Sequence, residues 1–467
     1  MSRSSLGVIV LAAGPGTRMK SALPKPLHPV CGIPMVQHVI DAARTLGPGK
    51  IVVTVGHGGD QVRQALAGED VVFVDQTEML GTGDAVRRCR DALDGFQDVM
   101  VLNGDCPLVS PRLLDMLANA NGSVAVAFVT ALVADPGLLG RLLRDGEGRP
   151  QRIVEAAEWT RVRPPTGQHG FELRFDVVSR GEQPLAEINA GQYVFDAAWL
   201  WEHIDHVPLS AKGEYYLTEL IRMASEEGRP GTTVPADPSD ILGVDDRVKL
   251  AAAERIMRAR IIEAHQLAGV TIVDPATTYI DAQVQLAQDV TILPNCHLQG
   301  TTTVAANSTI GPGTTLRNAT IQAATVVQTS VIEDSEIGTR CRVGPFSHVR
   351  GGALIGADCE LGNYSEVKNS RIGRGVKMHH FSYLGDADVG EDTNIAAGAI
   401  TCNWDGVNKN RTTIGAHVFI GCDTMLIAPV SVGDGALTAA GSVVNKDVPA
   451  GVRVAGVPAR PIPGKHA

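Results

Sequence analysis

The chain has 467 residues, of which 44% are hydrophobic and only 4% are aromatic. This length exceeds what one hydrophobic core normally serves, so two or three domains are expected. The net charge of −10 argues against a nucleic-acid or membrane-surface partner, and no apolar stretch approaches the ~20 residues of a membrane span. The eight cysteines form no C-x-x-C pair, which predicts reduced thiols and a cytoplasmic location rather than a zinc site or disulfides.

Residues 6–235 alternate between short apolar runs and amphipathic segments. This alternation is typical of a mostly parallel sheet with helices on both faces, in which ligands bind at the carboxyl ends of the strands. An α/β domain is therefore predicted over residues 1–240. Strands are expected at 7–13, 50–56, 71–75, 98–104 and 123–129, and helices at 35–46 and 60–67.

One long helix is predicted between Asp245 and Gly269, because the apolar residues there follow a helical period. The glycine can end this helix in a left-handed turn. We therefore expect a helical linker over 241–269 that joins two domains. The residues expected on its apolar stripe are Val248, Ala252, Ile256, Ile262 and Leu267.

The next segment carries an aliphatic residue at every sixth position. A period of six fits neither a helix nor one long strand. It fits a solenoid in which each unit supplies a short strand and a turn, with the aliphatic side chain pointing inward. Residues 270–467 are therefore predicted to form an all-β hexapeptide-repeat domain with a C-terminal tail. The clearest repeat consists of Ile337, Val343, Val349, Ile355, Leu361 and Val367, and glycine follows four of them at 338, 344, 356 and 362.

Arg350 and Lys368 stand where the repeat otherwise has glycine, and they are eighteen residues apart. If three units make one coil, as in known triangular hexapeptide helices, these cations stack in adjacent coils about 4.8 Å apart. Like charges this close are unfavourable unless an anion lies between them. The period therefore predicts an anion site, and the alternative is a pair of solvated surface cations.

The first expected strand ends in a glycine-rich turn, Gly14-Pro15-Gly16-Thr17-Arg18, which Pro24-Lys25-Pro26 follows. Such a turn lets backbone N–H groups approach a phosphate chain, and Arg18 and Lys25 add positive charge. The pattern is neither a Walker A motif nor G-x-G-x-x-G. Phosphate binding is the hypothesis, and a turn without function is its alternative.

The run LAAGPGTRM followed by LPKPL closely resembles the signature of sugar-1-phosphate nucleotidyltransferases. Further landmarks keep the order of that family: Gln76, the run from Gly81 to Ala85, and Asn103-Gly104-Asp105. The resemblance implies that Arg18 and Lys25 act in catalysis and that Asp105 and Asp245 hold Mg²⁺. It also implies a nucleotide and sugar site made of Leu11, Ala12, Ala13, Gly14, Lys25, Gln76, Gly81, Thr82, Asn103, Gly104, Asp105, Gly140, Glu155, Asn189 and Asp245.

The run from Gly362 to Gly406 resembles the acetyltransferase half of the bifunctional N-acetylglucosamine-1-phosphate uridyltransferase/glucosamine-1-phosphate N-acetyltransferase family. Together with the N-terminal signature, this likeness covers almost the whole chain. It implies an α/β domain with a Rossmann-like mixed sheet, joined by a long α-helix to a left-handed parallel β-helix.

An amine nucleophile near pH 7 needs a proton acceptor, for which imidazole is suited. His379 and His380 are adjacent, and the family motif implies that His380 is the base. The implied sugar-phosphate residues are Arg350, Lys368, Tyr383 and Asn394, with Glu366 as a supporting carboxylate. The implied acetyl-CoA residues are Ala397, Asn403, Trp404, Cys422 and Ala440.

Four positions depart from the family pattern. Asp245 stands where the family usually has asparagine, Trp404 replaces a tyrosine, Cys422 replaces a common serine, and Gly456 replaces an arginine, with Arg460 nearby. The resemblance also implies small-molecule substrates and a homotrimer with acetyl-transfer sites between neighbouring chains.

We therefore interpret the chain as an enzyme of two reactions. The C-terminal half acetylates glucosamine 1-phosphate from acetyl-CoA. The N-terminal half then couples N-acetylglucosamine 1-phosphate to UTP with Mg²⁺, which gives pyrophosphate and UDP-N-acetylglucosamine, a precursor of the bacterial cell envelope. One alternative is a single nucleotidyltransferase activity, with a β-helix that only oligomerises or regulates it. The other is a scaffold without catalytic activity.

Overall fold

The computed structural model describes residues 3–122, 124–156 and 185–463. These residues form two compact units, Met1–Met257 and Arg258–Ala467, and the division falls inside the long helix α8 (Arg247–Leu267). The last four residues of the predicted C-terminal tail and position 123 of an expected strand lie outside the described residues. Among the described residues, no helix is long and apolar enough to cross a membrane.

The first unit is built on a nine-stranded mixed sheet whose main path runs β11-β7-β10-β6-β1-β4-β5. Strand β10 is antiparallel to both of its neighbours on this path, and the other pairs on it are parallel. The strands are β1 (Arg3–Leu11), β4 (Pro48–Val55), β5 (Val72–Asp75), β6 (Asp98–Asn103), β7 (Val126–Val133), β8 (Arg141–Arg144), β9 (Pro150–Val154), β10 (Ala186–Asp196) and β11 (Thr232–Pro235), with a separate β2 (Pro29–Val30) and β3 (Ile33–Pro34) hairpin.

Alternation along the central strands gives the sheet two apolar faces. On β1, Val8 and Val10 belong to one buried cluster and Ile9 belongs to the other. Burying both faces requires helices on each side, as the sequence predicts. The helices are α1 (Met35–Arg44), α2 (Gly59–Ala65), α3 (Thr82–Arg87), α4 (Pro111–Ala120), α6 (Ala197–His203) and α7 (Glu219–Glu226), with short 3₁₀ turns at Thr17–Met19 and Lys25–Leu27.

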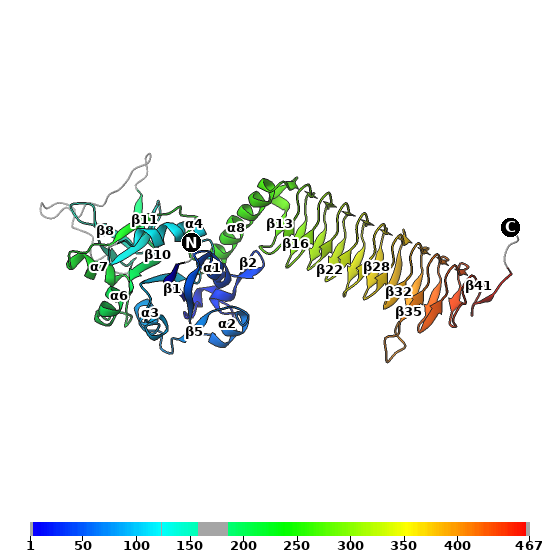
Figure 1. Cartoon of the computed structure of the whole chain (residues 1–467), viewed down its shortest axis with the longest axis horizontal. Helices are drawn as coiled ribbons and strands as arrows, with labels where there is room; N and C mark the ends of the chain where they lie inside the picture. Colours follow the sequence, from blue (N-terminus) through cyan, green and yellow to red (C-terminus); the bar gives the residue numbers. More distant parts are fainter. Residues whose placement is uncertain (1–2, 123, 157–184, 464–467) are drawn as a thin grey trace. The chain divides into compact units, whose positions relative to one another are not determined.

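The second unit is a parallel β-helix whose successive coils stack strand upon strand in register (Figure 1). Three ladders of strands form its three faces. The first is β12 (Thr271–Ile272), β15 (Thr291–Ile292), β18 (Thr309–Ile310), β21 (Val326–Val327), β24 (Arg342–Val343), β27 (Glu360–Leu361), β30 (Lys377–Met378), β33 (Asn394–Ile395), β36 (Phe419–Ile420), β39 (Leu437–Thr438), β41 (Arg453–Ala455) and β42 (Arg460–Pro461). The second is β13 (Tyr279–Ile280), β16 (His297–Gln299), β19 (Thr315–Arg317), β22 (Val331–Glu333), β25 (His348–Arg350), β28 (Ser365–Lys368), β31 (Ser382–Gly385), β34 (Ile400–Cys402), β37 (Met425–Ile427) and β40 (Val443–Val444). The third is β14 (Gln285–Leu286), β17 (Thr303–Val304), β20 (Thr320–Ile321), β23 (Glu336–Ile337), β26 (Leu354–Ile355), β29 (Arg371–Ile372), β32 (Ala387–Val389), β35 (Thr412–Ile414) and β38 (Val430–Val432).

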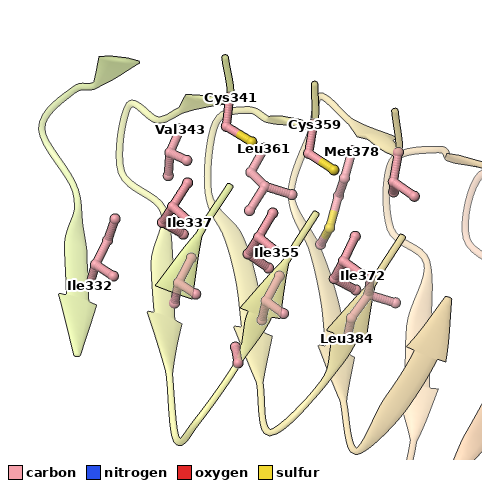
Figure 2. Close-up of a cluster of buried hydrophobic side chains, with 14 of the residues drawn as sticks. Ile332, Ile337, Cys341, Val343, Ile355, Cys359, Leu361, Ile372, Met378 and Leu384 are labelled. Atoms are coloured by element: carbon pink, nitrogen blue, oxygen red, sulfur yellow. The ribbon is translucent and has the colours of Figure 1, made fainter. Parts of the chain in front are cut away.

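The repeated aliphatic residues point into the β-helix and stack as columns, with Cys341, Cys359 and Met378 packed among them (Figure 2). Corners between strands need left-handed backbone, which Asp358 (φ 60°) and Asn369 (φ 47°) supply at low cost. The period of six predicted this core, and the structure confirms it.

The predicted apolar stripe of α8 is wrong at both of its ends. Val248 and Leu267 are exposed, whereas Ala253 and Ile262 are buried. The first part of α8 belongs to one unit and the second part to the other. One buried face therefore does not continue along all 21 residues, and the predicted stripe was too long.

Leu361→Ala should destabilise the β-helix by about 2–5 kcal/mol, because it opens a cavity in the aliphatic column. Leu361 is 1% exposed, and its register partners are Val343 and Met378. Leu354, which is 39% exposed, provides the matched control. Urea denaturation measures both variants, and equal losses for Leu361→Ala and Leu354→Ala would contradict the assignment of the core.

Candidate functional site

A cavity of about 320 Å³ opens at the carboxyl ends of β1, β4, β5 and β6 in the first unit. Glu214 and Tyr216, which belong to no motif in the sequence, also line it. Ten residues expected around the nucleotide line the cavity together: Leu11, Ala12, Ala13, Gly14, Lys25, Gln76, Gly81, Thr82, Asn103 and Asp105.

Two glycines let the loops of this cavity close tightly. Gly16 has a φ of 56°, and a Cβ there would lie 2.5 Å from the Cβ of Lys25. Gly81 has a φ of 97°, and a Cβ there would lie 2.7 Å from the carbonyl oxygen of Tyr215. Side chains at these positions would be strained and would also clash. The glycines thus bring the Lys25 turn and the 210–218 segment against the cavity.

Each of the two carboxylates expected to bind a metal is paired with a cation. Lys25 Nζ donates to Asp105 Oδ2, and Arg18 lies 2.6 Å from Asp245 Oδ2. The backbone N–H of Val244 donates to the carbonyl of Asp105, which ties the two carboxylate-bearing segments together. No cluster of three or more metal-ligating side chains occurs among the described residues. Magnesium sites commonly use only one or two carboxylates plus substrate phosphates, so this donor set fits Mg²⁺.

Arg247, which the sequence analysis missed, ties the start of α8 to both cationic turns. Its Nε donates to the carbonyl of Met19 and its Nη1 to Nδ1 of His28, both at 3.3 Å. Burial, and then the charge of Arg247, lower the pKa of His28. A neutral imidazole can accept this bond, so Arg247 fixes the turns that carry Arg18 and Lys25. No motif singles out Arg247, because its partners are distant in sequence.

The three residues expected around the sugar also come together. The N–H of Asn189 donates to the carbonyl of Gly140, and a Cβ on Gly140 would lie 3.6 Å from Glu155 Oε1. The Asn189 amide donates to the Tyr193 hydroxyl at 2.6 Å, and burial raises the pKa of Tyr193. Gly191 packs against Asn103 of the cavity wall, so this cluster adjoins the cavity.

On the β-helix, Arg350 and Lys368 are register partners in adjacent coils, as the period predicts. Glu366 accepts bonds from Arg350 Nε at 3.1 Å and from Nη2 at 2.6 Å. Contact with the Lys409 amine, then burial and Arg350, lower the pKa of Lys368. The side chains of Arg350, Lys368 and Lys409 therefore lie together at one edge of the second ladder, where β25 and β28 end. Lys409 escaped the sequence analysis because it lies in an excursion, residues 403–411 between β34 and β35, that interrupts the repeat.

Asp386, which the sequence analysis also missed, orients two side chains at this edge. Its carboxylate accepts bonds from the amides of Asn369 and Asn403, each at 2.5 Å. Asn403, expected to contact acetyl-CoA, is thus engaged with Asp386 and anchors the excursion that carries Lys409 and the exposed Trp404.

His380 lies near the opposite edge of the same face. The register partner of Lys368 is Gly385, five residues after His380, so the two side chains start on the order of 15 Å apart. His379 pairs with Glu360 at 3.0 Å. Asn394 lies on the first ladder rather than the second. One chain therefore does not bring His380 or Asn394 to the three cations.

Three of the residues expected to bind acetyl-CoA line up along the edge near His380. The N–H of Gly398 donates to Phe381, that of Asp423 to Ala397, and that of Gly441 to Cys422. These backbone bonds place Ala397, Cys422 and Ala440 in successive coils. Asn403 and Trp404 lie at the other edge, after β34. Arg460 on β42 pairs with Ala455, beside Gly456.

The cavity and the β-helix together define a nucleotidyltransferase domain followed by a hexapeptide-repeat transferase domain. Residues 8–209 match the MobA-like NTP transferase domain, residues 280–373 the GMPPB C-terminal domain, and residues 411–446 the bacterial transferase hexapeptide. A relative from Brevibacillus brevis, named Bifunctional protein GlmU, is 42% identical over 96% of this chain and 94% of its own length. Relatives with this name from Kineococcus radiotolerans and Corynebacterium jeikeium are 44% and 41% identical over 95% and 96% of this chain, and over 88% and 90% of their own lengths.

The chain belongs to the family of bifunctional GlmU proteins. It is an enzyme with a nucleotidyltransferase and an acyltransferase activity, as the sequence predicts, and its fold is an α/β domain followed by a left-handed β-helix. The interpretation as a bifunctional transferase is confirmed, in preference to a single activity or a scaffold.

Replacing Lys409 with Gln should raise the thermal stability of the β-helix at neutral pH while acetyl transfer falls about tenfold. The variant relieves repulsion on Lys368, because contact with the Lys409 amine, before burial and Arg350, lowers the pKa of Lys368. That repulsion is present below the folded pKa of Lys368 and fades as the pH rises through it, so the gain should shrink in alkali. Lys446→Gln, at an exposed position, is the control. Thermal melting of both variants across pH measures the effect, and equal melting temperatures would contradict the repulsion between Lys409 and Lys368.

Proposed function

We propose that the cavity of the first unit binds UTP and N-acetylglucosamine 1-phosphate, and that Arg18, Lys25, Asp105 and Asp245 form its reaction centre. The observation that carries this proposal is the gathering of ten motif residues, distant in sequence, around one cavity beside the Gly140–Glu155–Asn189 cluster. A sugar-phosphate oxygen attacks the α-phosphorus of UTP, and pyrophosphate leaves. The protein contributes positioning and charge rather than covalent chemistry.

In this proposal Asp105 and Asp245 would hold Mg²⁺ beside the nucleotide phosphates. The metal would supply positive charge against the phosphates during transfer. Lys25 and Arg18, now paired with Asp105 and Asp245, would turn to the phosphate oxygens when the nucleotide binds. Each carboxylate would thereby keep a positive partner, and each cation a negative one.

For acetyl transfer we propose that Arg350, Lys368 and Lys409 bind the phosphate of glucosamine 1-phosphate. Stacked cations of this kind are unfavourable alone and are stabilised by a dianion. Glu366 holds the guanidinium of Arg350, and Tyr383 lies on the adjacent strand of the same face. His380 takes a proton from the amine as it attacks the thioester carbonyl of acetyl-CoA. Ala397, Cys422 and Ala440 mark the path of the cofactor, together with Trp404.

The separation of His380 and Asn394 from the cations supports a homotrimer in which neighbouring chains complete each site. We include this assembly in the proposal, along with a cytoplasmic location. All eight cysteines are free thiols, which suits a reducing compartment.

Asp105→Ala and His380→Ala, made separately, should each strongly reduce one reaction and spare the other. Asp105→Ala should lower uridylyl transfer on the order of 10²-fold, as loss of one electrostatic stabiliser typically does. Pyrophosphate release from UTP and thiol release from acetyl-CoA measure the two reactions. Normal Mg²⁺-dependent turnover of Asp105→Ala would remove that carboxylate from the site.

Co-expression of His380→Ala and Lys368→Ala chains tests whether the acetyl-transfer site is shared. If neighbouring chains supply the base and the cations, about a quarter of the sites in randomly mixed trimers contain both wild-type residues. Thiol release should then recover to about that fraction. Mixtures as inactive as either variant alone would mean that one chain supplies both groups.

A further inference from the structure

A buried carboxylate lies behind the nucleotide cavity and takes no part in the reaction described above. Asp84, in the first turn of α3, has a side chain with no solvent exposure. Its Oδ1 accepts a bond from Arg87 at 2.5 Å, and its Oδ2 accepts one from Arg88 Nε at 2.8 Å. Burial raises the pKa of Asp84, but the bonds from Arg88, Gln76 and Arg87 outweigh this effect and lower it. Asp84 is therefore a carboxylate that can only accept hydrogen bonds.

Asp84 contacts the cavity through Gln76, which lines the cavity and is itself 5% exposed. The side-chain nitrogen of Gln76 donates to Asp84 Oδ2 at 3.1 Å and to the carbonyl of Gly81 at 2.9 Å. Both partners are acceptors only, so the NH₂ end of the amide must face them. Both of its protons are used, and Oε1 receives no donor from the described residues.

We infer that Asp84 sets the nucleobase preference of the cavity. Its hydrogen bond with the Gln76 side-chain nitrogen orients the amide so that Oε1, a hydrogen-bond acceptor, faces the base. Uracil presents an N3–H donor on its pairing edge, whereas cytosine presents an unprotonated N3. The carbonyl of Gln76 would pair with the first and oppose the second. This inference rests on the proposed nucleotide site and adds a positioning residue to it.

The two arginines make the arrangement rigid. Each lies on α3 or directly after it, and Arg87 also lies over the ring of Tyr215, 5.3 Å from its centroid. The carbonyl of Tyr215 in turn accepts a bond from Gly83. Without Asp84 only the carbonyl of Gly81 would orient the amide. A half-turn that offers its NH₂ to the base, as cytosine requires, would then cost one hydrogen bond instead of two. Discrimination based on a buried polar group is strong, because the wrong ligand leaves that group unpaired.

The test is the ratio of kcat/KM for UTP to that for CTP, with N-acetylglucosamine 1-phosphate as acceptor and the full chain as enzyme. Asp84→Ala should lower this ratio about tenfold, mainly through a loss with UTP and a gain with CTP. The ratio does not depend on how much of the preparation is active. A structural role alone would reduce both activities together.

Asp60→Ala is the matched control, because Asp60 also lies in the first turn of a helix but is fully exposed. Its ratio should equal that of the wild type. If Asp84→Ala yields no active protein, Asp84→Asn is tested in its place. The asparagine keeps the volume of Asp84, but its amide can hydrogen-bond to either the nitrogen or the oxygen of the Gln76 side chain. The ratio should therefore again fall. A ratio within threefold of the wild type in the active variant overturns the inference. A wild-type chain that releases no pyrophosphate from UTP refutes the proposed nucleotide site instead.

Discussion

In-register stacking of successive coils is the constraint on which the β-helix and its chemistry depend. Every coil must bury an aliphatic layer against the coils on either side, so a residue is held directly beside its counterpart in the next coil. This geometry gives a dry aliphatic core. It also forces outward-facing residues into fixed pairs, whether or not their charges suit one another.

Arg350 and Lys368 are such a pair, and the excursion adds Lys409 to them. Nearby carboxylates offset only part of this repulsion. Glu366 neutralises Arg350, and Asp386 lies near Lys368. The remaining positive charge lowers the stability of the unliganded fold, and under the proposed function it would bind the phosphate of the sugar substrate. Stability and function therefore compete at this edge.

The nucleotide site handles charge in a different way. Its cations and carboxylates pair with each other, and under the proposed function Arg18 and Lys25 would exchange these partners for the substrate phosphates. Behind them, Asp84 is shielded from solvent and holds a neutral amide in one orientation. Under the two proposals, the charges near the phosphates would serve the reaction, whereas the charge of Asp84 behind the base would serve nucleotide selection.

The period of six, the glycine-rich turn and the linear motifs by themselves determined the two-domain plan, the β-helix core, the stacking of Arg350 on Lys368 and most of the cavity wall. Each of these depends on residues at a fixed spacing, or on a turn that a short run specifies. Only the tertiary structure decided the roles of Arg247, Lys409, Asp386 and Asp84, since their partners are brought near by folding rather than by spacing. It also decided that His380 and the cations lie at opposite edges of one face, because strand register and not sequence distance sets where a side chain lies across a β-helix.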